Sequence, residues 1–434
     1  MSNPEGAVVA ASAESSGTVA IDAGILDQMI EIRRHLHRNP ELSNHEANTQ
    51  RYLRQMLAGE GISDIRDVAG FGLAVDIVGT GKPSNRKIAI RADIDALPIE
   101  EESGVDYASA NPGVMHACGH DAHASMGFAV AAHLHRSRAD FGGTVRLIFQ
   151  PAEEDSPSGG KRVVEEGLLD DVDAAICLHV DPYTPSGKIA VRSGPYTLAC
   201  DTFDAVVIGE AAHAAKPYEG IDAIAVACSM VGELQKIVSR EIDPYDPLVI
   251  SVTGINGGSA YNVVAGKVVL KGTIRRGSDA TRERAWRRVR EILEGMAASH
   301  GADVELTIHK GEPGVVNDGE MAELIAASGK ACIGADNVLD TPGWTIADDF
   351  GYYSERRPSV YFRLGIRNEA VGSVFPLHHP KFRVDEAALK VGAATWLRRR
   401  PDFCRRSRKI PTDQRGPKSA RASLHEPVRC LLSI

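Results

Sequence analysis

The sequence predicts an α/β protein in which a discontinuous, mixed-sheet domain is interrupted by a smaller domain of ferredoxin-like βαββαβ order. Two observations predict this. Short β-branched or apolar runs alternate with segments of helical periodicity over residues 24–180, and the alternation resumes at 359. Between about 193 and 309 the expected order changes to strand, helix, two strands, helix, strand.

The larger domain begins with two amphipathic segments, predicted as helices over 24–37 and 45–61. Four strands are expected next, with helices between the last three; they cover 73–79, 87–93, 144–150 and 174–180. This alternation favours a largely parallel arrangement of the strands. A strand at 359–366 and a helix at 385–400 complete the domain, which we therefore expect to comprise 23–192 and 310–400.

The inserted domain, 193–309, has its own pattern of elements. We expect strands at 202–209, 247–255, 267–275 and 303–309, and helices at 220–242 and 281–301. In this order the segments form a split βαβ unit of about 115 residues.

Composition excludes several classes of protein. Hydrophobic residues make up 43% and charged residues 25%, as in soluble globular proteins, and the net charge of −9 argues against a nucleic-acid partner. No apolar run approaches the roughly 20 residues that span a bilayer, so no membrane partner is expected. The seven cysteines lack a framework spacing, which favours a reducing, cytoplasmic location.

The sequence predicts disorder at both ends of the chain. Residues 1–22 lack the basic start and apolar core of a secretory signal, so we expect a disordered leader. Residues 398–434 hold eleven Lys or Arg against three Asp or Glu. We expect the tail, 401–434, to be disordered; a basic interaction tail is the alternative.

The stretch VMHACGHDAHASMGF (114–128) gathers one thiol and several imidazoles. A helix is expected to begin near Asp121, which leaves Cys118 and His120 in the turn before it, where they can converge on one point. The positive helix end would favour the thiolate of Cys118, the form that binds metal. The alternative is a buried cysteine with solvated histidines, and the motif alone does not decide between the two.

A pair of acids follows the apolar strand of RLIFQPAEED. Burying Glu153 and Glu154 together is costly because like charges raise a pKa, and a cation would relieve that cost. On an extended backbone the two side chains point in opposite directions, so one could bind metal while the other faces the water that the metal activates. An exposed acidic turn is the alternative.

Histidines end two further segments. His179 closes the strand 174–180, where a lone histidine would more often be a core residue, and His378 and His379 precede the last helix. Three successive strand ends thus carry metal-binding residue types. Active sites of open α/β sheets lie outside the carboxyl ends of the strands, and mixed Cys, His and Glu ligands suit a divalent transition metal.

These motifs, taken together, resemble a known family. The chain is similar to the amidohydrolase branch of the metallopeptidase superfamily that contains aminoacylases, carboxypeptidase G, hippurate hydrolase and the plant indoleacetyl-amino-acid hydrolases. The matching segments appear in the family's order over about residues 25–395: RRHLHRNPEL, RADIDALPIEE, MHACGHDAH, FQPAEE, GLLDDVDAAICLHV, GTIR, ADDFGYY and LHHPKF.

The resemblance implies a centre of two divalent metal ions, Mn²⁺ or Zn²⁺, with Co²⁺ or Ni²⁺ as alternatives. It implies that Glu153 is the catalytic base and that His379 occupies a variable position. The implied metal ligands are Cys118, His120, Glu154, His179 and His378. Asp95, Asp121, His116 and His123 would orient or cap these groups, although surface polarity is an equal alternative for the last two.

The resemblance also assigns roles within the smaller domain, which would act as a lid and dimer contact. His213 matches a histidine that helps to stabilise the oxyanion and that reaches a partner's site in related dimers. Asn262 and Arg275 resemble residues that hold the substrate carboxylate, for which the planar fork of arginine is suited. Without the resemblance, His213 would be interpreted as a turn histidine, Asn262 as a hairpin asparagine and Arg275 as a surface arginine.

Some positions depart from the family pattern. Tyr218 stands where relatives commonly have histidine, which puts the substrate range in doubt. Asp348 stands where glutamate is usual, and Asp93 replaces a metal-binding histidine of other branches, as is normal in this branch.

The expected protein is therefore a metal-dependent amidohydrolase that acts on small N-acyl amino acids and assembles as a homodimer or higher homo-oligomer. A dipeptidase or carboxypeptidase on the same scaffold is an alternative. A metal-binding scaffold protein without catalysis is a third reading, against which Glu153 argues.

Overall fold

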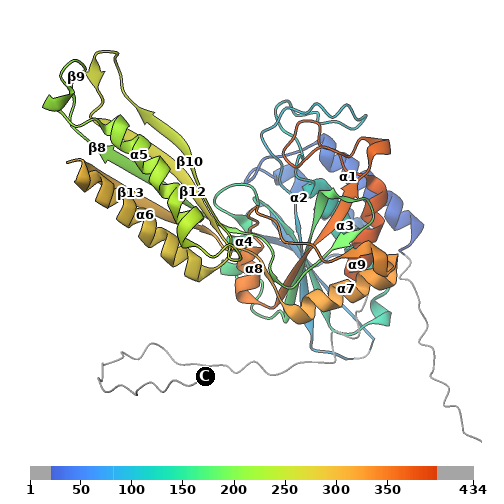
Figure 1. The fold of residues 1–434 in the computed structure, drawn as a ribbon. Coiled ribbons are helices and arrows are strands. Elements are labelled where there is room, and N and C mark those ends of the chain that lie inside the picture. Colours follow the sequence, from blue (N-terminus) through green and yellow to red (C-terminus); the bar gives the residue numbers. More distant parts are fainter. Residues whose placement is uncertain (1–20, 82, 398–434) are drawn as a thin grey trace, which may run out of the picture.

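An eight-stranded mixed sheet forms the centre of the larger of two units (Figure 1). The computed structural model describes residues 21–81 and 83–397. The strands, in sheet order, are β1 (Ile65–Val68), β2 (Gly72–Val78), β4 (Thr144–Gln150), β3 (Lys87–Asp93), β5 (Ala174–Pro185), β16 (Ser359–Arg367), β6 (Ile189–Ala190) and β15 (Val338–Leu339). The predicted mixed sheet is confirmed.

The four central strands β4, β3, β5 and β16 are parallel, so their carboxyl ends meet at one edge. Antiparallel pairs lie outside them, between β1 and β2, β2 and β4, and β16 and β6. The sheet is therefore parallel at its centre and mixed as a whole. β3 and β4 have the predicted bounds, whereas β5 runs on to Pro185 past the expected end at 180.

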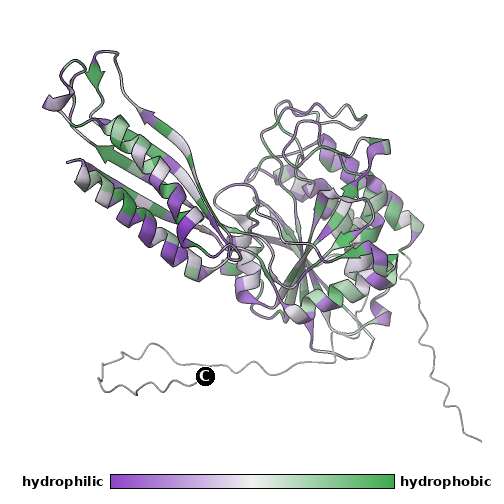
Figure 2. Ribbon diagram, viewed as in Figure 1, coloured by the Kyte–Doolittle hydropathy of each residue, from purple (hydrophilic) through white to green (hydrophobic). Residues whose placement is uncertain are grey.

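Helices cover both faces of the sheet, which explains the near-continuous apolar strand runs. One core lies under α1 (Ala23–Arg38), α2 (Ala47–Gly59), α3 (His120–Arg136), α7 (Gly319–Ile333) and α9 (Leu389–Leu397), and another lies by α4 (Gly159–Glu165) and α8 (Gly351–Arg356). On β4, Leu147 and Phe149 point into the first core and Ile148 into the second. Figure 2 shows these central strands as predominantly apolar.

The smaller unit contains β8 (Ala199–Ile208), α5 (Ala223–Lys236), β10 (Leu248–Gly257), β12 (Lys267–Arg276), α6 (Asp279–Ser299) and β13 (Asp303–Glu312). Its sheet is antiparallel, in the order β10-β12-β8-β13. Apolar residues of this sheet and of both helices form a separate core. The helix expected over 220–242 ends at Lys236 and is followed by one π-helical turn, Ile237–Glu241.

Two segments connect the units. They are held together as an antiparallel pair, β7 (Gly194–Pro195) with β14 (Val316–Asn317). The smaller unit extends away from the larger one, and its two-stranded ribbon of β9 (Ala212–His213) and β11 (Val263–Val264) lies at the far end (Figure 1).

Nearly all of the predicted leader, 1–22, and the whole of the predicted tail, 401–434, lie outside the described residues. Within the described part, no helix has the length and apolar character that crossing a membrane requires.

Candidate metal centre

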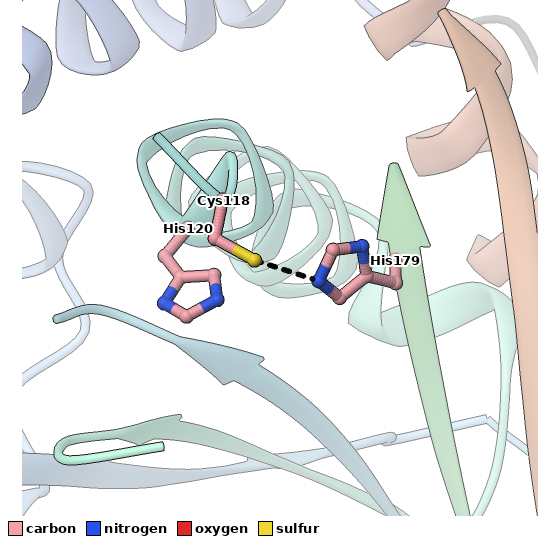
Figure 3. Close-up of side chains that lie close together, drawn as sticks. All are labelled: Cys118, His120 and His179. Atoms are coloured by element: carbon pink, nitrogen blue, oxygen red, sulfur yellow. Dashed lines mark hydrogen bonds between the residues drawn. The ribbon is translucent and has the colours of Figure 1, made fainter. Parts of the chain in front are cut away.

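Cys118 and His120 lie at the start of α3, where the chain turns sharply (Figure 3). Gly119 between them has φ +89°, and a Cβ at this position would lie 2.5 Å from Val180 Cγ2. Only glycine adopts this conformation without strain in so little space. The turn directs the sulfur of Cys118 to 3.4 Å from Nε2 of His179.

His179 reaches the centre because β5 extends beyond the point where its pairing with β3 ends. The last pair of β3 with β5 is Arg91 with Cys177, and His179 lies two residues further along. Its ring stacks on that of Tyr361, with centroids 6.2 Å apart, and makes an edge contact with Trp344, with centroids 5.4 Å apart. Burial, reinforced by His123, holds the pKa of His179 well below its usual range, so the ring is neutral, as a metal ligand must be.

Glu153 and Glu154 do not lie on an extended backbone, and the expectation that they point in opposite directions is wrong. β4 ends at Gln150, and the chain then turns at Ala152, which has φ +49°. The N–H of Ala152 donates to Glu46 Oε1 at 2.8 Å. Both acids therefore face His120, each with a carboxylate oxygen 4.0 Å from its Nε2.

His378 comes from the loop that precedes α9. Its φ of +62° is uncommon for a residue with a side chain, and its N–H donates to Ala117 O at 2.9 Å. Nε2 lies 3.0 Å from Glu154 Oε1. The neighbouring His379 instead stacks on Phe375, with centroids 4.8 Å apart.

The predicted ligands and the predicted base thus meet at one edge of the sheet. Within each of three overlapping groups, the potential ligand atoms lie within 4.8 Å of one another: Cys118, His120 and His179; Cys118, Glu154 and His378; and His120, Glu153 and Glu154. Thiol, imidazole and carboxylate donors at such spacing fit divalent transition ions.

His120 provides a direct test of that fit. Its Nδ1 lies 3.0 Å from Asp95 Oδ1, whereas its buried Nε2 has no hydrogen-bond partner. A carboxylate behind a histidine fixes the tautomer that a metal requires. The other oxygen of Asp95 accepts from the N–H of Glu154 at 3.0 Å and from the hydroxyl of Ser43 at 2.6 Å, which ties the acid pair to the same support.

The surroundings of Cys118 within the chain oppose the thiolate that the helix end was expected to favour. Burial, followed by the charges of Glu154 and Glu153, raises the pKa of the Cys118 thiol well above its usual value, which outweighs the helix end. At His120 burial lowers the pKa, but Asp93 and Asp95 together outweigh it and raise the value to about 10.

The sequence did not single out a network of buried charges behind the centre. The guanidinium of Arg91 is 0% exposed and lies 2.5 Å from Asp93 and 2.7 Å from Asp349. Asp93 also contacts the ring of His123, with Oδ1 2.6 Å from Nδ1. The overlooked signal was the arginine inside the apolar run KIAIRAD, because a charge in a buried strand requires partners.

His116 and His123 are both buried, so surface polarity is not their role. Nε2 of His123 accepts from the N–H of Val180 at 2.9 Å. Asp121 accepts from Arg33 Nε at 2.9 Å and lies 2.9 Å from His37 Nδ1, which locks the start of α3 against α1.

Two of the three residues expected on the smaller unit, His213 and Asn262, lie away from the cluster of their own chain. His213 lies on β9 at the far end of that unit (Figure 1), and Asn262 lies in the turn before β11, where its carbonyl accepts from Ala214. Both are exposed. Arg275 lies on β12, paired in register with Cys200 of β8 and Val249 of β10.

We predict that binding of a divalent ion to the metal-free protein releases protons and strengthens as the pH rises. At neutral pH His120 and Cys118 each still hold the proton that a metal must displace, because both pKa values lie above that pH. Calorimetric titration with Zn²⁺ in buffers of different ionisation enthalpy measures the release. The His120→Asn variant should bind weakly and release fewer protons, whereas the control His379→Asn should match the wild type. An affinity that does not change with pH would contradict this prediction.

Comparisons with known proteins agree with this geometry. Residues 89–398 match peptidase family M20/M25/M40. An uncharacterised hydrolase of Sinorhizobium fredii is 42% identical over 84% of this chain and 90% of its own length. Two relatives are each 38% identical: N-acetyl-L-cysteine deacetylase of Bacillus subtilis, over 83% of this chain and 85% of the relative, and thermostable carboxypeptidase 2 of Saccharolobus solfataricus, over 85% and 93%.

A solved structure extends the likeness to the fold. The dinuclear metal-binding M20 peptidase of Bacillus subtilis superposes with a TM-score of 0.76 at 34% identity, over 87% of this chain and 97% of that one. In agreement with the resemblance of its motifs to the amidohydrolase branch, the chain belongs to peptidase family M20/M25/M40.

Proposed function

We propose that the protein is a metal-dependent amidohydrolase that cleaves the amide bond of N-acyl amino acids or related small amides. The observation that carries this proposal is the convergence of Cys118, His120 and His179 with a pair of glutamates at the carboxyl edge of the sheet. The similarity to a deacetylase of an N-acetyl amino acid supports the substrate class.

Five residues would hold two divalent ions: Cys118, His120, Glu154, His179 and His378. The donor set and the unpartnered Nε2 of His120 support this assignment, as does the dinuclear relative. When bound, such ions would polarise the scissile carbonyl and make a water molecule easier to deprotonate. Mn²⁺ or Zn²⁺ are the metals proposed, with Co²⁺ or Ni²⁺ as alternatives, since these ligands do not distinguish among them.

Glu153 is the proposed general base. Its carboxylate is 10% exposed and lies 4.0 Å from His120 Nε2, next to the proposed ligands. Burial, together with Asp348 and Glu154, raises the pKa of Glu153 well above its usual range, which favours a group that takes and returns a proton. Glu153 would accept the proton of the attacking water and deliver it to the amine nitrogen as the amide bond breaks.

The smaller unit is proposed to be a ferredoxin-like lid and dimer contact, with Arg275 and Asn262 holding the substrate carboxylate. Because His213 lies far from the cluster of its own chain, we propose that it acts in the site of a partner chain. β10 is an edge strand, and the outer face of α5 beside it exposes small or uncharged residues at Ile224, Ala225 and Cys228. Such an edge and face are suited to pairing with a second copy.

A cytoplasmic location is part of the proposal. Within the described part of the chain, Cys118, Cys177, Cys200 and Cys228 form no disulfide, as in a reducing compartment.

Replacing Glu153 with Gln should abolish turnover while leaving metal content nearly unchanged, because the amide keeps the size of the side chain but cannot accept the proton. Metal analysis and initial rates on the same preparation measure both quantities. Glu165→Gln, an exposed change on α4, is the matched control and should keep full activity. Substantial turnover by the Glu153→Gln variant would exclude its role as base.

We expect the protein to hydrolyse N-acyl amino acids faster than free dipeptides. The test removes the metal, restores Mn²⁺ or Zn²⁺, and compares the rates on acetyl- and benzoyl-amino acids with those on dipeptides. Faster cleavage of dipeptides would favour the second candidate, a dipeptidase or carboxypeptidase, which the likeness to a carboxypeptidase supports. No turnover of either class by the loaded protein would favour a non-catalytic metal-binding scaffold.

Mixing inactive variants should test the shared site. If His213 serves the partner, His213→Ala and Glu153→Gln chains refolded together should regain activity that neither has alone, because one mixed site then holds both intact groups. The Glu153→Gln variant mixed with a Glu153→Gln, His213→Ala chain is the control and should stay inactive. A monomer in sedimentation analysis would rule out this arrangement.

A further inference from the structure

The loop before Asp348 places an aromatic side chain beside a proposed metal ligand. The ring of Trp344 lies 5.4 Å from that of His179, at an interplanar angle of 77°. Trp344 is only partly buried, whereas His179 is 2% exposed. Trp344 therefore keeps some exposed surface at a position beside the cluster.

The backbone fixes the position of this indole. The N–H of Trp344 donates to Tyr196 O at 2.8 Å, and two residues later Ile346 O accepts from the N–H of Leu198 at 3.0 Å. The loop thereby pairs with the segment that leads into the smaller unit. A ring held in this way loses little conformational freedom when a ligand packs on it.

A buried cation fixes the ring from one side. The guanidinium of Arg363 lies 5.0 Å from the ring of Trp344. Arg363 is 5% exposed and donates to Tyr196 Oη at 3.1 Å and to Pro342 O at 3.0 Å, with Asp181 at 3.5 Å. Because the guanidinium of Arg363 already lies over the ring, it would repel a second cation packed on the indole, whereas a neutral flat group carries no charge for it to repel.

We propose that Trp344 is a specificity-determining residue that packs against a neutral aromatic ring of the substrate beside His179. Ring pairs favour offset or edge contacts with centroids 4.5–7 Å apart, and a fixed, partly exposed indole offers such a contact. The inference rests on the proposed function, since it names the class of small amide that the site prefers. The ring can belong to the acyl group or to the amino acid, and the substrates below distinguish the two.

The kinetic test compares N-benzoylglycine, N-acetylphenylalanine and N-acetylglycine. Trp344→Leu keeps an apolar side chain but removes the ring. It should lower kcat/KM for one of the two aromatic substrates, relative to N-acetylglycine, by roughly tenfold, mainly through KM. Trp344→Phe should restore most of the preference. Tyr245→Leu, at a side chain that is 96% exposed in the smaller unit, is the control and should change no ratio.

Unchanged ratios in Trp344→Leu overturn the proposal. An equal loss on all three substrates assigns Trp344 to support of His179 instead and also overturns it. A loss confined to N-benzoylglycine places the ring on the acyl side, and a loss confined to N-acetylphenylalanine places it on the amino-acid side.

A binding measurement keeps the inference separate from the proposed function. Benzoate or phenylalanine should quench tryptophan emission in the wild type and in Trp286→Phe, whereas acetate and glycine should not, and Trp344→Phe should lose the response. Equal quenching in Trp344→Phe overturns the proposal. If the loaded wild type hydrolyses none of the three amides, the proposed function fails, and the emission data still decide whether Trp344 binds an aromatic ring.

Discussion

The candidate centre depends on a single constraint: the acids gathered at the buried edge of a sheet must each find a positive charge. On the inner side the protein supplies that charge, because Arg91 lies between Asp93 and Asp349. On the outer side Glu153 has His120 at 4.0 Å, and the pKa values of Glu153 and Cys118 are both raised. Burial without full compensation is costly, and the same shortage of positive charge makes the binding of cations favourable.

Unusual backbone conformations direct the side chains toward this point. Gly119, Ala152 and His378 all have positive φ, and each lies at or beside a proposed ligand or base. For a residue with a side chain this region is sparsely populated and persists only where the surroundings enforce it. Here those surroundings include the carboxylate of Glu46 on the N–H of Ala152 and the carbonyl of Ala117 on the N–H of His378.

The two units contribute unequally to the centre. The larger one brings the cluster together by itself, because its parallel strands end at a common edge. The smaller one carries His213 at its far end (Figure 1), so an isolated chain lacks a group that the motif resemblance assigns to the reaction. The loop that holds Trp344 is hydrogen-bonded to the segment leading into the smaller unit, which places a candidate substrate contact next to the junction.

The sequence by itself determined the strands β3 and β4, the mixed sheet and which residue types stand at the strand ends, because apolar runs and the motifs that follow them are local patterns. It did not determine the direction of Glu153 and Glu154, since one residue in the left-handed region at Ala152 turns both toward His120. It also missed the partner of Arg91, which is 258 residues away at Asp349. Tertiary structure decided these points because charge compensation in a buried site is set by contacts between distant segments, and such contacts leave no periodic pattern along the chain.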